Sequence, residues 1–186
     1  MIRFLVFAAT LVIAFGPAHA EELDLAASKI IVHVEKSGLF SAFAHNHTIA
    51  APLASGSLDS AQHTVQLTFH SADMKVLDPE AKKSERATIE STMKSDKVLD
   101  VAHFPDISFV VTSVESAAPN KYTVHGNLTL HGATRPIEMP VSFSAGHYGG
   151  KVNLKQTDFG IIPVKIAGGA VRVKDVIQIT FDVATK

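Results

Sequence analysis

The chain has 186 residues, of which 17 are Lys or Arg, 18 are Asp or Glu and none is cysteine. A formal net charge of −1 gives no reason to expect nucleic acid as a partner. The lack of cysteine excludes disulfides, thiolate catalysis and covalent haem attachment through C-x-x-C-H. We therefore expect a domain that is held together by its core alone.

Residues 1–20 have the layout of a secretory signal peptide. A positively charged start precedes an apolar run from Phe4 to Phe15, and the small-residue motif A-H-A ends at Ala20. The apolar run is too short to span a bilayer, which needs about 20 residues. We expect cleavage after Ala20, so that residues 21–186 form one mature, exported domain that does not span a membrane.

Most of the mature sequence alternates between apolar and polar residues. In residues 122–131, for example, Tyr122, Val124 and Leu128 share one face of a strand and polar side chains occupy the other. A period of two predicts half-buried strands in an antiparallel sheet. The predicted strands are residues 29–35, 41–50, 64–70, 106–115, 122–131, 137–145, 151–157 and 176–184. About eight strands at this spacing predict an all-β barrel or sandwich.

Residues 79–94 lack the alternation and are rich in helix-forming residues. Asp78 is a suitable N-cap, and Pro79 suits the first helical position. Ile89 and Met93 lie four residues apart and form a narrow apolar stripe. We therefore expect a helix on the outside of the sheet, across a barrel opening.

The sequence contains no nucleophile elbow, phosphate-binding loop or dinucleotide-binding fingerprint. Closed barrels of about eight strands can hold one small ligand in the interior. These observations favour a binding module over an enzyme, and they give no reason to expect a cofactor.

Three stretches are similar to motifs of one known family. They are VLDVAHFPDISF at residues 98–109, GNLTLHGATRPIEMPVSF at residues 126–143 and TDFGI at residues 157–161. In this order they resemble the YceI-like, polyisoprenoid-binding family, and the resemblance extends over residues 21–186. It implies a lipocalin-like antiparallel barrel with one or two short helices, a periplasmic location and no catalysis. It also implies an apolar lumen that holds a long isoprenoid lipid or a quinone.

The glycines, prolines and Asp158 in these motifs also suit ordinary turns, so a structural role is the simpler interpretation of the motifs themselves. The lumen of such a barrel would be lined by the inward apolar side chains. The residues that we expect to bind the ligand there are Phe40, Phe43, Phe69, Phe109, Tyr122, Leu128, Met139, Phe143, Ile179 and Phe181.

His45 and His47, in SAFAHNHTIA at residues 41–50, depart from the usual pattern of the family. If Phe43 and Ile49 mark the inner face of a strand, both imidazoles point inward. Three roles remain open for the pair, because imidazole suits them all. The rings could bond the backbone or water, bind the polar end of a ligand such as a quinone carbonyl or a diphosphate, or bind a metal ion or haem. Residues 37–44 could instead form a helical turn that ends near His45.

The metal alternative predicts a redox or stress protein that uses His45 and His47, with a membrane cytochrome as partner. A catalytic zinc site needs a third protein ligand. The candidates are His103, His147, Glu90 and Asp73, and their spacing places none of them near the pair. A third alternative is an interaction protein whose core is filled by its own side chains.

Overall fold

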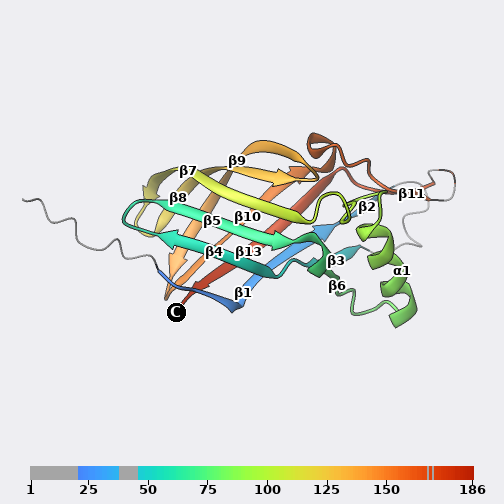
Figure 1. The fold of residues 1–186 in the computed structure, drawn as a ribbon, viewed down its shortest axis with the longest axis horizontal. Coiled ribbons are helices and arrows are strands. Elements are labelled where there is room, and N and C mark those ends of the chain that lie inside the picture. Colours follow the sequence, from blue (N-terminus) through green and yellow to red (C-terminus); the bar gives the residue numbers. More distant parts are fainter. Residues whose placement is uncertain (1–20, 38–45, 167, 169) are drawn as a thin grey trace, which may run out of the picture.

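The computed structural model describes residues 21–37, 46–166, 168 and 170–186. Within these ranges the fold is a strongly curved antiparallel sheet with one α-helix (Figure 1). The longer strands are Leu23–Val34 (β1), His47–Ala50 (β3), Leu53–Asp59 (β4), Thr64–His70 (β5), Asp106–Ala118 (β7), Lys121–Leu130 (β8), Ala133–Ser144 (β9), His147–Lys155 (β10) and Val176–Thr185 (β13). The short strands are Lys36–Ser37 (β2), Lys75–Val76 (β6), Lys165–Ile166 (β11) and Val171–Val173 (β12). The helix is Lys83–Lys94 (α1), and 3-10 turns cover Ser71–Asp73 and Gln156–Phe159.

Ten strands form the main sheet, in the order β4-β5-β7-β8-β9-β10-β13-β1-β3-β6. β3 and β4 are two parts of one bent run that is interrupted at Ala51 and Pro52. β3 pairs with β1 and β4 pairs with β5, so this run brings the two edges of the sheet together. The N–H of Glu21 donates to the carbonyl of Leu58 at 2.7 Å and adds a second link between the edges. The predicted all-β, lipocalin-like barrel is therefore confirmed, with more strands than the predicted eight.

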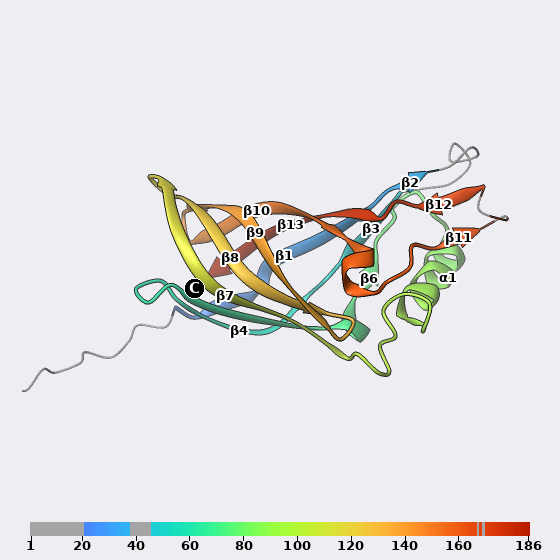
Figure 2. The ribbon, with the colours of Figure 1, turned by 90° about the horizontal axis from the view of Figure 1, so that it is seen from above.

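The barrel has two different ends, which we call the α1 end and the turn end. The α1 end carries α1 and the small sheet β11-β12-β2 (Figure 2). The turn end carries the tight connections from β4 to β5, from β7 to β8 and from β9 to β10, together with the C-terminus (Figure 1). No helix in the described ranges is long and apolar enough to cross a bilayer.

The predicted alternation sets which side chains face the interior. Val124, Leu128 and Met139 are buried on the inner faces of β8 and β9, whereas neighbours such as Asn127 and Glu138 are exposed. The hydrophobic effect selects this register, because a slip by one residue would move every apolar side chain to the solvent.

The predicted helix exists, but it begins at Lys83 and not at Pro79. Its N-cap is Lys82, whose N–H is accepted by the Glu85 carboxylate at 2.9 Å. Asp78 was predicted as the N-cap, and this was wrong. Its carboxylate accepts hydrogen bonds from His47 and Thr48 of β3, so it does not cap the helix. Ile89 and Met93 face the interior, as their spacing predicted.

The three motif stretches meet at the α1 end and contact one another. The Phe104 ring stacks on His131 with 4.4 Å between the ring centres. The Nδ1–H of His131 donates to the carbonyl of Phe159 at 3.2 Å, and Arg135 Nε donates to the carbonyl of Asp158 at 2.8 Å. These contacts join three connections of the barrel, so the structure gives the motifs a structural role.

Candidate functional site

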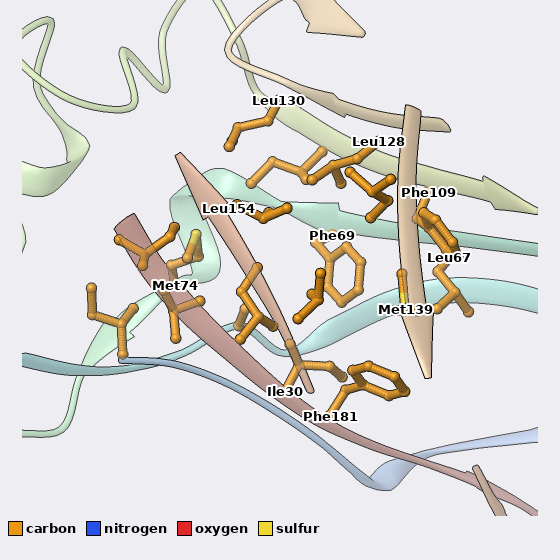
Figure 3. Close-up of a pocket in the computed structure, with 18 of the residues that line it drawn as sticks. Ile30, Leu67, Phe69, Met74, Phe109, Leu128, Leu130, Met139, Leu154 and Phe181 are labelled. Atoms are coloured by element: carbon orange, nitrogen blue, oxygen red, sulfur yellow. The ribbon is translucent and has the colours of Figure 1, made fainter. Parts of the chain in front are cut away.

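The interior of the barrel contains a cavity of about 720 Å³ that extends from the α1 end to the turn end. A barrel filled by its own side chains would leave no such space, so the alternative with a filled core does not fit. Figure 3 shows side chains from several strands, among them Ile30, Phe69, Leu128 and Leu154, directed toward a common space. The cavity lies within the range of about 300 to 1,000 Å³ that ligand pockets occupy.

Most of the predicted ligand-binding residues in the described ranges line this cavity. They are His47, Phe69, Phe109, Tyr122, Leu128, Met139, Ile179 and Phe181. They come from β3, β5, β7, β8, β9 and β13, so residues that are far apart in sequence share one wall. The structure fixes their position, and their role in ligand binding remains a prediction.

The other predicted positions lie elsewhere. Phe40, Phe43 and His45 are outside the described residues. Phe143 is near the end of β9 and does not line the cavity. Its ring packs against the Tyr148 ring, with 4.6 Å between the ring centres. Phe143 therefore supports the wall from outside the cavity at the turn end.

A hydrogen-bonded pair, His47 and Asp78, forms one polar feature of the α1 end, where Glu35, Lys36 and Arg172 also line the cavity. The Nδ1–H of His47 donates to Asp78 Oδ2 at 2.7 Å, and the N–H of Thr48 donates to Asp78 Oδ1 at 2.7 Å. The Asp78 side chain is only 4% exposed, whereas that of His47 is 23% exposed and borders the cavity. Because Asp78 holds Nδ1, Nε2 is the ring nitrogen that is left to meet a ligand.

Helix α1 covers the cavity at this end. Thr88, Ile89 and Met93 line the cavity from one face of the helix. On the same helix, Glu90 accepts the N–H of Val76 at 3.1 Å and the Lys94 ammonium at 2.7 Å. The bond from Lys94, and then the bond from Val76, hold the pKa of Glu90 below its usual value. Glu90 thereby joins the helix to β6 through an ionised carboxylate.

Tyr148 and Tyr122 line the turn end of the cavity. Burial is the main cause that raises the pKa of the Tyr148 phenol above its usual value. The second cause is the carboxylate of Glu21, which also hydrogen-bonds to the phenol. Tyr148 was not among the ligand-binding residues predicted from the sequence. Its position in the alternating run of β10, on the same face as Val152, was the signal that could have found it.

Asp78 was also missed as a partner of His47, because 31 residues separate the two and no local pattern links them. Among the residues that the structure describes, no group of three or more His, Asp or Glu side chains could hold a metal ion. The metal and haem alternative also needs His45, which is outside the described ranges, so that alternative remains a prediction.

A strongly curved antiparallel barrel with a hollow apolar interior can hold a small ligand in its lumen. A comparison with family models matches residues 22–185 to the YceI-like domain. The match covers nearly the whole described chain. The chain therefore belongs to the YceI-like domain family, as the three motif stretches predicted.

Curated relatives match over a shorter region. A UPF0312 protein of Pseudomonas savastanoi pv. phaseolicola is 35% identical over 79 residues, which are 37% of this chain and 41% of the relative. A UPF0312 protein of Pseudomonas putida is 34% identical over 88 residues, which are 42% of this chain and 46% of the relative. The chain therefore spans less than half the length of these relatives.

Solved structures share the fold at low identity. BcnA of Burkholderia cenocepacia superposes with a TM-score of 0.69 at 20% identity, over 89% of this chain and all of that one. A polyisoprenoid binding domain from Saccharophagus degradans, described as implicated in plant cell wall breakdown, superposes with a TM-score of 0.62 at 17% identity. This second match covers 90% of this chain and 98% of that domain. At such identity the likeness establishes the fold alone.

Proposed function

We propose that this protein is a periplasmic carrier that binds a long-chain isoprenoid lipid or an isoprenoid quinone in the lumen of its barrel, without catalysis. The observation that carries the proposal is the apolar cavity of about 720 Å³ that runs between the two ends. The description of the Saccharophagus degradans domain as polyisoprenoid binding supports the ligand class.

The binding energy would come from burial of the hydrocarbon tail. Each buried CH₂ contributes about 0.8 kcal/mol. Side chains such as Val124, Leu128 and Ile179 offer the tail an apolar surface without hydrogen bonds that would fix its position. A long tail can therefore bind tightly by burial alone, and specific hydrogen bonds form only with the polar head group.

The polar head group would lie at the α1 end, beside His47. The buried Asp78 carboxylate holds the imidazole in place, so that Nε2 can form a hydrogen bond with a head group. The turn end offers the two phenols together with Asp59, Ser60 and His63, and the Asp59 carboxylate already accepts the N–H of Gln62. The fixed imidazole thus favours one orientation of the ligand, with its head at the α1 end and its tail toward the turn end.

Export would follow from the leader at residues 1–20. The protein recovered from the periplasmic fraction of a Gram-negative host is expected to begin at Glu21. Recovery of the full-length chain in the membrane fraction would contradict this part of the proposal.

Extraction of the purified protein with organic solvent, followed by mass spectrometry, tests the function. The expected result is a co-purifying isoprenoid lipid or quinone, or stoichiometric uptake of an added isoprenoid quinone by protein that was first stripped of lipid. Absence of both would contradict the proposed function. The V152D variant, which places a charge in the cavity lining, is taken through the same extraction as the control for lipid that adheres non-specifically.

A further inference from the structure

Two glycines on the inner wall create space that two phenylalanine rings fill. On β8, Gly126 lies between Val124 and Leu128 on the inner face. On β10, Gly150 lies between Tyr148 and Val152, which both line the cavity. Glycine in the interior of a strand weakens the strand and often marks a close approach by another group.

The approaching groups are Phe109 of β7 and Phe181 of β13. A Cβ atom added at Gly126 would lie 2.4 Å from Cε2 and 2.5 Å from Cζ of Phe109, and 2.7 Å from the carbonyl oxygen of Val110. A Cβ atom added at Gly150 would lie 2.3 Å from the carbonyl oxygen of Pro140 and 2.6 Å from Cζ of Phe181. Real Cβ atoms do not approach other carbons so closely, so each ring occupies space that exists only because its neighbour is glycine.

Both rings border the cavity (Figure 3). Phe109 pairs with Leu128 of β8 and Phe181 pairs with Gly150 of β10, so the strand register places both rings between the two ends. Along β8, the chain runs from Tyr122 at the turn end past Gly126 to Leu130 at the α1 end. Along β10, it runs from Tyr148 past Gly150 to Leu154. A tail that enters beside His47 must therefore pass the two rings before it can reach the tyrosines.

We infer that Gly126 and Gly150 determine the length of the ligand, because they let Phe109 and Phe181 lie back against the wall and keep the cavity continuous. With a larger side chain at either position, the ring could move only toward the lumen, since the backbone of the sheet lies behind it. The cavity would then end at the rings, and only short tails would fit. This inference rests on the proposed function and adds a residue-level basis for chain-length selection.

The test compares three tryptophan variants. F109W and F181W enlarge the ring over each glycine without changing the backbone, and V110W places a tryptophan on the exposed outer face of β7, next to Phe109. The natural chain contains no tryptophan, so each variant carries a single tryptophan. Binding of farnesol, a short prenol, and solanesol, a long one, is measured for each variant and for the wild type by equilibrium partition of radiolabelled lipid.

The wild type is expected to bind solanesol more tightly than farnesol. Since each CH₂ that leaves the cavity weakens binding about fourfold, F109W and F181W should lose at least about tenfold in affinity for solanesol. Their affinity for farnesol should stay within about twofold of the wild type. V110W should bind both prenols like the wild type.

A second pair of variants separates the ring from the backbone. G126A is expected to lose solanesol and keep farnesol. G126A/F109L should regain part of the affinity for solanesol, because the shorter side chain clears the added methyl group while the carbonyl oxygen of Val110, 2.7 Å from that group, stays in place. The control G149A adds a Cβ atom whose nearest neighbours are at 3.7 and 4.0 Å, which is ordinary contact. G149A should therefore bind like the wild type.

The inference is overturned if F109W and F181W bind solanesol as the wild type does. It is also overturned if they lose both prenols to the same extent, since that result would indicate a general loss of structure. If the wild type itself binds neither prenol nor any isoprenoid quinone, the proposed function has failed, and this outcome is distinct because it appears before any variant is compared.

Discussion

The two ends of the cavity differ in how firmly their polar groups are held. At the α1 end, the buried carboxylate of Asp78 accepts hydrogen bonds from His47 and from the backbone of Thr48. At the turn end, the phenol of Tyr148 is half-buried and interacts with Glu21, which begins the described chain. Among the described residues that line the cavity, the α1 end presents an imidazole that a buried carboxylate holds in place, whereas the buried carboxylate at the turn end, Asp59, accepts the N–H of Gln62 at 2.9 Å. The orientation proposed for the ligand depends on this contrast.

The largest expected loss of lipid affinity comes from a charge in the apolar lumen that connects the two ends. Val152 lines the cavity, and its neighbour Asn153 faces out from the same strand. V152D would place a charge against the tail, and because an unpaired charge in apolar surroundings costs several kcal/mol, lipid affinity should fall by about a hundredfold or more. N153D adds the same charge outside and should bind lipid like the wild type. Equal affinity of the two variants in a lipid partition assay would place the ligand outside the barrel.

The next effect concerns the stability of the α1 end. D78A leaves the N–H groups of His47 and Thr48 without their acceptor, so the free energy of unfolding should fall by about 2 kcal/mol. Asp96 is exposed, and D96A should change the free energy of unfolding by less than about 0.5 kcal/mol. Urea unfolding of both variants measures the difference. A D78A variant as stable as the wild type would show that the pair contributes nothing to holding this end together.

A smaller effect is expected on head-group binding. His47 and His70 each donate to an aspartate, at 2.7 Å and 2.8 Å, but only His47 borders the cavity. H47A should weaken binding of an isoprenoid with a polar head group about fivefold, which corresponds to one net hydrogen bond. H70A should leave the affinity unchanged, and the same change in both variants would remove His47 from the head-group site.

The smallest effect is a titration at the turn end. Since burial and Glu21 raise the pKa of Tyr148, the folded state holds the phenol proton more tightly than the unfolded chain does. The stabilisation linked to Tyr148 is complete below a pH of about 10 and is lost as the pH rises through the raised value. The chain has two tyrosines and no tryptophan, so phenolate absorbance measured against pH follows the ionisation of Tyr122 and Tyr148. Y148F should remove the part of this absorbance change that belongs to Tyr148.

Ligand binding sharpens this titration into a test of how far the tail reaches. A tail that arrives at the turn end excludes water from Tyr148, and greater burial disfavours the charged phenolate. Solanesol should therefore raise the pKa of Tyr148 further, whereas farnesol should not. No shift with saturating solanesol would mean that the tail stops before the turn end.

The sequence predicts much of the wall and less of the ends. Alternation with a period of two assigns Phe109, Leu128 and Ile179 to the inner face without knowledge of strand pairing, because the faces of a strand follow from local geometry. It does not assign Asp78 to His47, since their contact depends on how the segment before α1 folds back on β3. Local capping rules placed Asp78 at the helix start, and the tertiary contact overrode them.

The glycine and phenylalanine contacts illustrate the same limit. Gly126 in the middle of an alternating run is a local signal of a close approach. The identity of the approaching residue is not local. Val111 is the direct cross-strand partner of Gly126, and Phe109 is the direct partner of Leu128. The Phe109 ring therefore contacts Gly126 along the diagonal between these two pairs. Only the register between β7 and β8 reveals that contact.

A crystal structure of the protein loaded with solanesol tests most directly whether the lumen holds the lipid. We expect continuous ligand density through the barrel, with the hydroxyl beside His47 Nε2 and the tail passing Phe109 and Phe181 toward Tyr148. An empty or water-filled lumen with the lipid bound on the outer surface would contradict this expectation.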